Sequence, residues 1–314
     1  MAPALNLVDD VRPAAQREAR ALLEALEAPG VQDRAVRIGL TGAPGSGKST
    51  LLDAMVRRAR AVGQTVGLVA VDPSSRRTGG ALLGDRVRVR AGAADPGVFF
   101  RSMAARGRLG GLAEGARAAV LVLGVAFDRV LVETVGVGQS EGEVTDLVDT
   151  LVFLAQPGAG DQLQGMKAGV LELPDILAVN KADMGPIAER TAAELEAGIA
   201  LGESAHGGWR RPVLRISAQE GTGLDALEDA LAAHRAWLIE THELARRRRR
   251  GRDRAVELGL GLRYGTHGLA AIGGAGTLAE RLAAAPDAPA ARLLAELSRA
   301  IEEALQHTRS GGTA

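Results

Sequence analysis

A glycine-rich loop that contains a lysine is the part of this sequence best suited to chemistry. It lies between an apolar run that ends at Leu40 and the apolar start of a helix at Leu51. Its residues are Gly42-Ala43-Pro44-Gly45-Ser46-Gly47-Lys48-Ser49-Thr50. This is the G-x-x-x-x-G-K-[ST] pattern in the strand, loop and helix context that it requires, where backbone N–H groups face bound phosphates. Lys48 is then placed for the β- and γ-phosphates, and the Ser49 hydroxyl for Mg²⁺.

The scarcity of lysine strengthens this interpretation. Lys48, Lys167 and Lys181 are the only lysines among 38 basic residues. Genomic base composition explains most of the arginines, but a compact ammonium on a flexible stem is not equivalent to a planar guanidinium. Two of the three lysines, Lys48 and Lys181, lie inside recognisable nucleotide motifs.

Two further segments indicate that the base is guanine. Asn180-Lys181-Ala182-Asp183 closes an apolar strand, and the carboxylate of Asp183 can accept both N1–H and the exocyclic amino group of guanine, a paired donor edge that adenine lacks. Lys181 would lie against the base and ribose, while Asn180 reaches the purine edge or braces the loop. Ser217-Ala218-Gln219, followed by G-x-G two residues later, resembles the element that completes guanine pockets in GTPases. Together they predict GTP rather than ATP.

Carboxylates between these motifs are candidates for holding Mg²⁺. Asp72 ends an apolar strand, and Asp85 follows a Leu-Gly pair in a loop. Both could converge on the phosphate-bound metal or its waters, although Asp72 also suits an ordinary turn and Asp85 a helix cap or a surface charge. Glu133 begins the sequence E-T-V-G at a strand end, where GTPases commonly place D-x-x-G. The longer glutamate can still reach a metal-bound water, and the N–H of Gly136 can meet the γ-phosphate.

The sequence marks no dedicated group to position the attacking water. Phosphoryl transfer to water depends on positioning and charge neutralisation, and Mg²⁺, Lys48 and the loop amides can supply the charge. Gln139 and Asp161 are candidates for the positioning group. We therefore predict slow intrinsic turnover that rises when a partner orders the switch segments.

The composition excludes several other classes of protein. The chain has 314 residues, of which 46% are hydrophobic, and its 38 basic residues balance 38 acidic ones, so no net charge draws it to nucleic acid or an anionic membrane. It has no cysteine for disulfides, thiolate metal sites or nucleophiles. Its first ten residues do not resemble a signal peptide, and no apolar run is long enough to span a bilayer. We expect a cytoplasmic protein.

Short apolar runs at intervals that leave room for helices predict parallel strands buried on both faces. They are Ala35–Leu40, Val66–Val71, Val130–Glu133, Thr150–Ala155, Ile176–Asn180 and Val213–Ser217. The predicted fold is α/β, with a doubly wound and mostly parallel sheet as in P-loop GTPases. The predicted division is a helical N-terminal extension over residues 1–34, the nucleotide-binding domain over 35–237 and a helical C-terminal extension over 238–314.

Three helices are predicted in the extensions. Val11–Ala28 has helical spacing and is followed by Pro29-Gly30, Gly223–Val256 predicts one long helix, and Ala288–Leu305 predicts a last helix that serves packing or dimerisation. The long helix carries the arginine run Arg246–Arg250. We interpret this run as the solvated face of an exposed helix rather than a nucleic-acid patch, because the chain is neutral and has few aromatic residues to stack on bases.

Several longer segments resemble the MeaB/ArgK family of P-loop GTPases. The resemblance covers roughly Ala35 to Trp237 and is weak over the tail. The segments that carry it are Asp72-Pro73-Ser74-Ser75, Thr78-Gly79-Gly80, Leu82-Leu83-Gly84-Asp85, Phe99–Ser102, Arg106–Leu112, Glu133–Glu141 and Pro157–Gly169.

The resemblance implies a GTPase that acts as chaperone of an adenosylcobalamin-dependent acyl-CoA mutase, chiefly methylmalonyl-CoA mutase. In that family, GTP binding and hydrolysis gate cofactor loading and protect the mutase. Carried over by motif, the residues around Mg²⁺ are Ser49, Asp72, Asp85 and Glu133.

The resemblance also implies three switch segments and a homodimer. The first switch is Thr78–Asp85 and the second is Glu133–Glu141. Gln156–Lys167 resembles an additional switch that relays the nucleotide state to the mutase, in which Lys167 would contact Asp161, the nucleotide region or the partner. The C-terminal helices would form a dimerisation arm, although a G-G-A-G sequence at residues 273–276 interrupts that region.

Two alternative functions belong to other classes. A nickel-insertion metallochaperone uses a related GTPase core but needs soft or imidazole ligands, and the five histidines form no cluster in the sequence, with His234 and His242 eight residues apart on a charged helix. A kinase of transport proteins, the older idea attached to ArgK relatives, would prefer ATP, which the guanine-type loop argues against.

Overall fold

The computed structural model describes residues 1–10, 12–28, 30–31, 33–72, 95–104, 111–134, 140–158, 171–200 and 207–310. Helices α1 (Ala2–Asp9) and α2 (Pro13–Leu26) come first. The central elements are β1 (Val36–Thr41), α3 (Lys48–Ala61), β2 (Val66–Asp72), β3 (Val98–Ala104), α4 (Gly111–Ala126), β4 (Arg129–Thr134), α5 (Ser140–Thr145), β5 (Thr150–Ala155), β6 (Ile176–Val179), the 3-10 helix Ala182–Met184, α8 (Pro186–Ala200) and β7 (Val213–Arg215). The last elements are α9 (Leu224–Glu240), α10 (Glu243–Ala271), α11 (Gly274–Ala284) and α12 (Ala290–Ser310).

The strands that the structure describes form one parallel sheet, in the order β3-β2-β4-β1-β5-β6-β7. From β1 the chain continues to β2 and β3 on one side, returns to β4 beside β1, and then continues to β5, β6 and β7 on the other side. The strand order therefore reverses beside β1. In open α/β sheets, ligands bind outside the carboxyl ends of the strands at such a point. The predicted doubly wound α/β fold is confirmed, and β1 leads directly into the glycine-rich loop.

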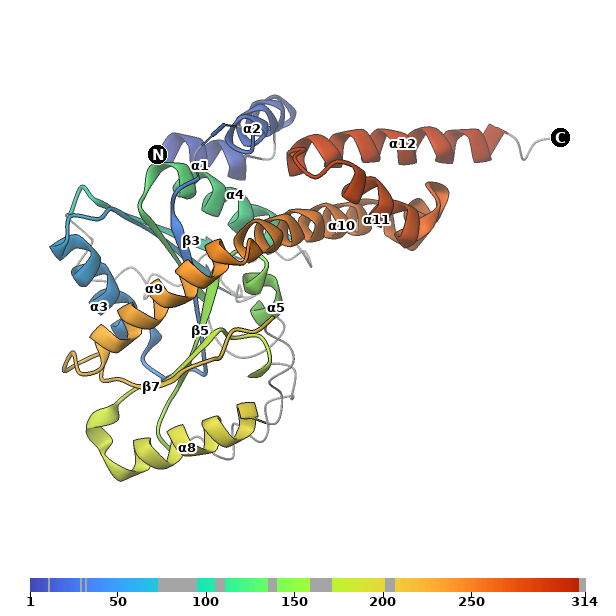
Figure 1. The fold of residues 1–314 in the computed structure, drawn as a ribbon. Helices are drawn as coiled ribbons and strands as arrows, with labels where there is room; N and C mark the ends of the chain where they lie inside the picture. The colour runs from blue at the N-terminus through green and yellow to red at the C-terminus, as the bar shows by residue number, and fades with distance from the viewer. Residues whose placement is uncertain are drawn as a thin grey trace.

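Helices cover both faces of the sheet (Figure 1). On one face, Leu40 and Leu131 pack in a core with Leu51 and Leu52 of α3 and with the leucines of α9. On the other face, the core contains Val132, alanines and valines of α4, and Leu5 of α1. Since neighbouring strand residues point to opposite faces, near-continuous apolar strands are what a sheet buried on both sides requires.

The six predicted strands correspond to β1, β2 and β4 to β7, whereas β3 was not predicted. β3 has the sequence V-F-F-R-S-M-A and forms one edge of the sheet. The guanidinium of Arg101 in this strand pairs with the carboxylate of Asp9 in α1. An edge strand is buried less completely than a central one and so tolerates polar residues. β3 therefore lacks the apolar pattern from which the other strands were predicted.

The prediction of one helix over Gly223–Val256 is wrong. The chain forms α9 and α10, and the break lies at Thr241 and His242, where His242 has a φ of 58°. A residue in the left-handed conformation cannot continue a right-handed helix. The break lies close to the predicted domain boundary at residue 237, and that division of the chain stays a prediction.

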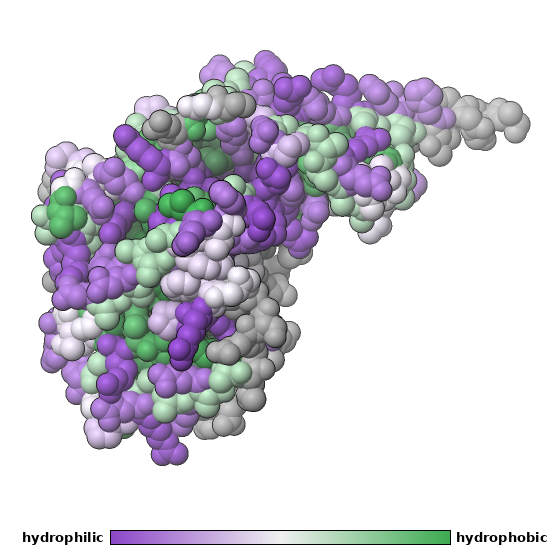
Figure 2. Space-filling model, viewed as in Figure 1, coloured by the Kyte–Doolittle hydropathy of each residue, from purple (hydrophilic) through white to green (hydrophobic). Residues whose placement is uncertain are grey.

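Helices α10, α11 and α12 pack around a small core of their own and form an arm that projects from the sheet (Figure 1). The last helix spans Ala290–Ser310, and the chain turns between α10 and α11 at the predicted glycine-rich interruption. Figure 2 shows hydrophilic and hydrophobic residues mixed over the visible face of the arm. No helix among the residues that the structure describes is long and apolar enough to cross a membrane.

Candidate nucleotide-binding site

The glycine-rich loop occupies the predicted place between β1 and α3. Thr41 ends the strand and Lys48 is the first residue of the helix, so the N–H groups of the first helical turn face the loop. The Lys48 side chain is only 7% exposed, and its Nζ donates to the carbonyl oxygens of Gly42 (2.8 Å) and Ala43 (3.1 Å). These contacts hold the ammonium inside the curve of the loop, beside the helix N-terminus. Thr50, two positions further along the helix, is exposed.

Asn180 ties this loop to the opposite side of the site. Its Nδ2 donates to the carbonyl oxygen of Ser46 (2.8 Å), and its Oδ1 accepts from the backbone N–H of Ala218 (3.0 Å). A Cβ on Gly47 would lie 2.3 Å from Asn180 Nδ2, and Gly47 has a φ of 94°. Only glycine suits that backbone conformation and that close approach. Of the two roles predicted for Asn180, the contacts match the bracing of the loop.

Asp183 and Ser217, which the sequence assigned separately to a guanine pocket, are in contact. The Ser217 hydroxyl donates to Asp183 Oδ1 over 2.7 Å. Lys181 adds a bond from its Nζ to the carbonyl oxygen of Gly45 (3.1 Å). The loop after β6 therefore contacts the glycine-rich loop directly, and the loop after β7 is joined to it through Asn180 and Asp183. Gln219 is exposed at the rim of this unit.

Ser49 and Glu133 meet between α3 and β4. The Ser49 hydroxyl donates to Glu133 Oε1 over 3.1 Å. Glu133 is opposite Leu40 in the parallel pairing of β4 with β1, so the end of β4 lies beside the start of the glycine-rich loop. Asp72 is the last residue of β2, the strand on the other side of β4, and ends at the same edge of the sheet.

The remaining predicted residues lie outside the part of the chain that the structure describes. They are Asp85, Gly136, Gln139, Asp161 and Lys167, together with most of the three predicted switch segments. The roles predicted for these residues stay predictions.

The interpretation of Arg246–Arg250 as a solvated face is wrong for two of the five arginines. Arg247 donates to both carboxylate oxygens of Asp175 (2.8 and 2.6 Å). Arg248 donates to both carboxylate oxygens of Asp149 (2.8 Å each) and to the carbonyl oxygen of Ala35 (3.0 Å). Both carboxylates are fully buried. Sequence analysis missed these anchors, although an aspartate directly before an apolar strand is a signal for a buried partner at the amino edge of a sheet.

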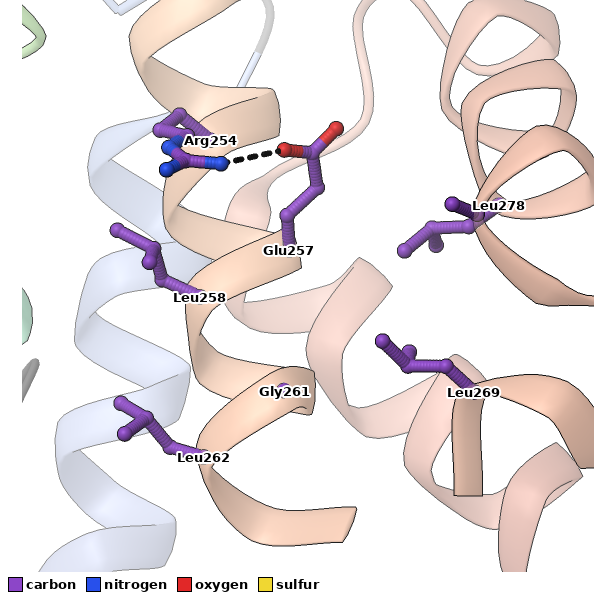
Figure 3. Close-up of a pocket in the computed structure, with 8 residues that line it drawn as sticks. Arg254, Glu257, Leu258, Gly261, Leu262, Leu269 and Leu278 are labelled. Atoms are coloured by element: carbon purple, nitrogen blue, oxygen red, sulfur yellow. Dashed lines mark hydrogen bonds and ion pairs between the residues drawn. The ribbon is translucent and has the colours of Figure 1, made fainter. Parts of the chain in front are cut away.

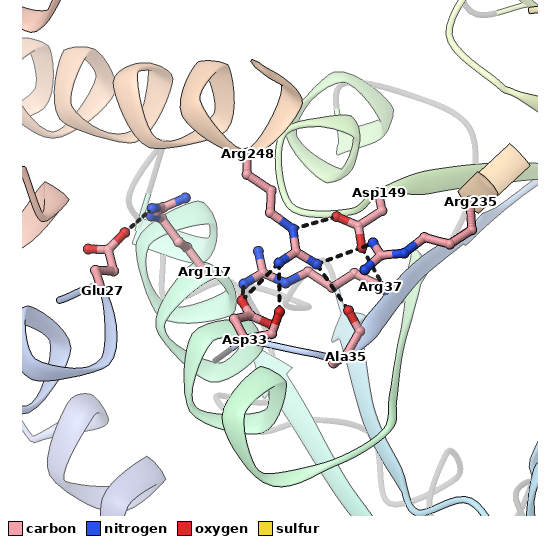
Figure 4. A network of polar contacts seen from close by, with 8 residues as sticks. All are labelled: Glu27, Asp33, Ala35, Arg37, Arg117, Asp149, Arg235 and Arg248. Carbon is pink, nitrogen blue, oxygen red and sulfur yellow. Dashed lines mark hydrogen bonds and ion pairs between the residues drawn. The ribbon is translucent and has the colours of Figure 1, made fainter. Parts of the chain in front are cut away.

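A larger polar network surrounds Asp149 (Figure 4). The Asp149 carboxylate also accepts from the backbone N–H of Arg37 (3.1 Å) and from Arg235 Nη1 (2.9 Å). Burial opposes the ionisation of this carboxyl, but the hydrogen bonds and charges of Arg248 and Arg37 outweigh burial and hold its pKa below the ordinary value. This network lies at the amino ends of the strands, opposite the glycine-rich loop.

His234, one of the histidines considered as a metal ligand, is a residue of α9 and is buried. Its side chain is fully buried, its Nδ1 lies 2.8 Å from Thr150 Oγ1, and its ring stacks on that of Trp237 and is tilted against that of Trp209. His242 lies on the link after α9 rather than on the same helix. Among the described residues, no group of three or more histidine, aspartate or glutamate side chains is arranged to hold a metal ion.

A parallel sheet with this glycine-rich loop and with the N-K-x-D and S-A segments in the loops after β6 and β7 (the base-side loops) defines the class of the protein: it is a P-loop GTPase. The family model described as methylmalonyl Co-A mutase-associated GTPase MeaB matches residues 1–260, and the chain belongs to that family.

Individual relatives agree with the family. The chain is 45% identical over 216 residues to a putative GTPase of Pyrococcus abyssi, which covers 68% of this chain and 66% of that protein. It is 38% identical over 215 residues to the mitochondrial methylmalonic aciduria type A homolog of Mus musculus, covering 68% of this chain and 52% of the mouse protein. A crystal structure described as LAO/AO transport system kinase superimposes with a TM-score of 0.67 at 27% identity, covering 96% of this chain and 92% of that one.

Proposed function

We propose that the carboxyl edge of the sheet binds GTP and that its base-side loops select guanine. The observation that carries this proposal is the pairing of Ser217 with Asp183, whose carboxylate lies in the same unit as the loop around Lys48 because Asn180 joins the two. An ionised carboxylate is an acceptor only, and guanine presents N1–H and an amino group side by side. Membership of a GTPase family supports the same conclusion.

Asp183→Asn tests the guanine assignment. An amide presents one acceptor and one donor, so it no longer matches guanine but matches xanthine, which has an oxygen in place of the amino group. Calorimetry should show GDP affinity falling about 100-fold, roughly 2.7 kcal/mol, while the affinity for xanthosine diphosphate rises. Unchanged GDP affinity in the variant would contradict the assignment.

The donors at Ser49 and Glu133 fit Mg²⁺. Mg²⁺ prefers hard oxygen ligands in octahedral geometry at about 2.1 Å, which places neighbouring ligands about 3 Å apart. The two side-chain oxygens lie 3.1 Å apart. Asp72 and Asp85 are the other two carboxylates that we propose hold Mg²⁺, either directly or through a bound water. When bound, Mg²⁺ neutralises charge on the β- and γ-phosphates.

Hydrolysis then depends on groups of the chain that hold the phosphates and the water. We assign Lys48 and the loop N–H groups to the phosphate charge and the Gly136 N–H to the γ-phosphate. Gln139 and Asp161 are the candidates for positioning the water, and Lys167 acts in the additional switch. We propose that a partner must order these segments before hydrolysis becomes fast. GTP turnover by the isolated chain should therefore be slow.

We further propose that the protein is a chaperone of an adenosylcobalamin-dependent acyl-CoA mutase, most simply methylmalonyl-CoA mutase, and that GTP hydrolysis gates loading of the cofactor. The name of the family and the mouse relative support this partner. Single-turnover GTP hydrolysis should accelerate when the mutase is added. Equal rates with and without a mutase that binds the chain would contradict partner activation, and failure to bind any such mutase would contradict the partner.

The arm is the proposed site of homodimerisation. A pocket of about 370 Å³ lies on it, where Leu269 and Leu278 both point toward the stretch of α10 that holds Gly261 (Figure 3). Leu262, which also lines this pocket, is 49% exposed. Leu262→Asp should shift the mass measured by light scattering from dimer to monomer, because a buried unpaired carboxylate is costly. A wild-type monomer at all concentrations would contradict the dimer.

A further inference from the structure

Two buried hydroxyl groups join the ends of the two central strands beneath the candidate site. Thr41 is the last residue of β1 and Thr134 the last residue of β4, and their side chains are 1% and 0% exposed. Thr134 Oγ1 lies 3.1 Å from Thr41 Oγ1 and 3.5 Å from the carbonyl oxygen of Leu40. The backbone pairing of the two strands ends at Leu40 and Glu133. The contact between the two hydroxyls therefore joins β1 and β4 one residue beyond the last backbone pair.

The position of this pair is not explained by strand formation. Leu40, which precedes Thr41, and Val132, two residues before Thr134, are apolar. Valine would fill the same space as threonine with an equal preference for strands. A buried hydroxyl adds a polar group that costs about 1–3 kcal/mol unless it is bonded. The hydrogen bond that Thr134 donates to Thr41 has a directional effect that valine would lack, because a hydrogen bond fixes separation and angle.

The pair lies between the two motifs that contact phosphate and metal. Thr41 precedes Gly42, and Thr134 follows Glu133. Successive strand residues point to opposite faces: Leu131 packs in the core with α3 and Val132 in the core with α4. By the same alternation Glu133 projects toward α3, where Ser49 lies 3.1 Å away, and Thr134 projects to the other face. Fixing Thr134 thus fixes the backbone from which the Glu133 carboxylate projects.

We propose that Thr134, held by the Thr41 hydroxyl, is a positioning residue that sets the Glu133 carboxylate against the Ser49 hydroxyl and so tunes the affinity of the site for a magnesium-bound nucleotide. The inference rests on the proposed function, since it requires that Ser49 and Glu133 hold the metal. It adds a residue that contacts neither metal nor nucleotide and acts through Glu133.

The test compares Thr134→Val with Thr134→Ser and with Thr150→Val. Thr150 is similarly buried, at 1% exposure, and its hydroxyl is also hydrogen-bonded, to His234. It is the first residue of β5, so it lies at the amino ends of the strands, away from the glycine-rich loop. Calorimetry measures GDP affinity in Mg²⁺ and in EDTA for each variant. The ratio of the two affinities reports the contribution of the metal without relying on activity.

We expect Thr134→Val to lower this ratio about tenfold, the smaller end of the effect of outer contacts on metal ligands, while GDP affinity in EDTA stays within about twofold of wild type. Thr134→Ser, which keeps the hydroxyl, should restore the ratio. Thr150→Val should leave it unchanged. Should Thr134→Val fail to fold, Thr41→Val removes the other hydroxyl and should lower the ratio in the same direction.

A wild-type ratio in Thr134→Val, or an equal fall in Thr150→Val, would overturn the inference, because the effect would then be absent or merely structural. Failure of the proposed function looks different: wild-type protein would bind ADP as well as GDP, or would bind GDP equally with and without Mg²⁺. The second of these results would overturn the inference as well.

Discussion

The two edges of the sheet use the same residue type for different purposes. At the amino edge, Asp149 and Asp175 are fully buried and each accepts two hydrogen bonds from an arginine of α10. At the carboxyl edge, Asp183 and Glu133 accept from the hydroxyls of Ser217 and Ser49. A guanidinium compensates a carboxylate charge fully, whereas a hydroxyl orients the carboxylate and preserves its charge.

This difference separates structure from function along a single sheet. Arginine anchors at the amino edge hold α10, and with it the arm, on the core. Hydroxyl-bonded carboxylates at the carboxyl edge keep their negative charge for a cation or for a base with paired donors. Changes at the amino edge should therefore affect stability, and changes at the carboxyl edge should affect nucleotide binding.

The largest effect is expected from Asp149→Asn. Removing the charge leaves Arg248, Arg235 and the buried Arg37 without their shared partner, and breaking a buried ion pair on one side costs about 3–5 kcal/mol. Urea unfolding should show this loss. Asp225→Asn is the matched control, because Asp225 is 86% exposed in its ion pair with Arg58 and should cost less than about 1 kcal/mol. Similar losses of unfolding free energy in both variants would contradict the role of Asp149 as the anchor of α10.

A smaller effect, on binding instead of stability, is expected from Asn180→Ala. The carbonyl of Ser46 and the N–H of Ala218 lose their partner, a penalty of about 1–3 kcal/mol that corresponds to an about 5- to 150-fold loss of GDP affinity. The only other asparagine, Asn6, contacts Arg101 at the surface, and Asn6→Ala should bind GDP as wild type does. Calorimetry that found no loss in Asn180→Ala would show that the loops act independently.

Next in size is a pair of substitutions on α10. A Cβ on Gly251 would lie 2.0 Å from the carbonyl oxygen of Asp146, whereas a Cβ on Gly261 would meet nothing within 4 Å. Gly251→Ala should therefore destabilise the protein by about 1–3 kcal/mol. Gly261→Ala should raise stability by up to about 1 kcal/mol, since alanine is the better helix former. Thermal unfolding of both variants distinguishes a specific contact of the arm with the core from a general effect of glycine.

The smallest effect is expected in the acid dependence of stability. Because the pKa of Asp149 is lower in the folded protein, the unfolded chain takes up the proton first as the pH falls. The stability that Asp149 provides is present above the ordinary aspartate pKa of about 3.9 and is lost as the pH falls from there through the folded pKa. Wild-type protein should lose stability more steeply than Asp149→Asn in this range, as measured by urea unfolding at each pH. Parallel curves would show that Asp149 does not titrate below its usual range.

Sequence alone predicted the carboxyl edge better than the amino edge, for a physical reason. The loop of Lys48 and the segment of Asn180 are local patterns, because each presents backbone and side-chain groups to one ligand within a few residues. The Arg248 contact joins residues 99 positions apart, and nothing near either residue specifies the other. The hydroxyl pair of Thr41 and Thr134 has the same property, since each threonine alone suits an ordinary strand.

The misplaced elements follow the same rule. β3 lacks the near-continuous apolar run of the strands that are buried on both faces, because it lies at the side of the sheet. The end of α9 lacks a glycine or proline, and the left-handed residue that ends it is His242. In both places, tertiary contacts determine the local structure, so the pattern within a short window could not predict it.

The central claim is that the carboxyl edge of this sheet is a guanine-nucleotide site. Titration of nucleotide-free protein with GDP and with ADP, each in Mg²⁺, tests it most directly. The account predicts that GDP binds at least 100-fold more tightly than ADP, about 2.7 kcal/mol. Equal affinity for the two nucleotides, or a preference for ADP, would contradict it.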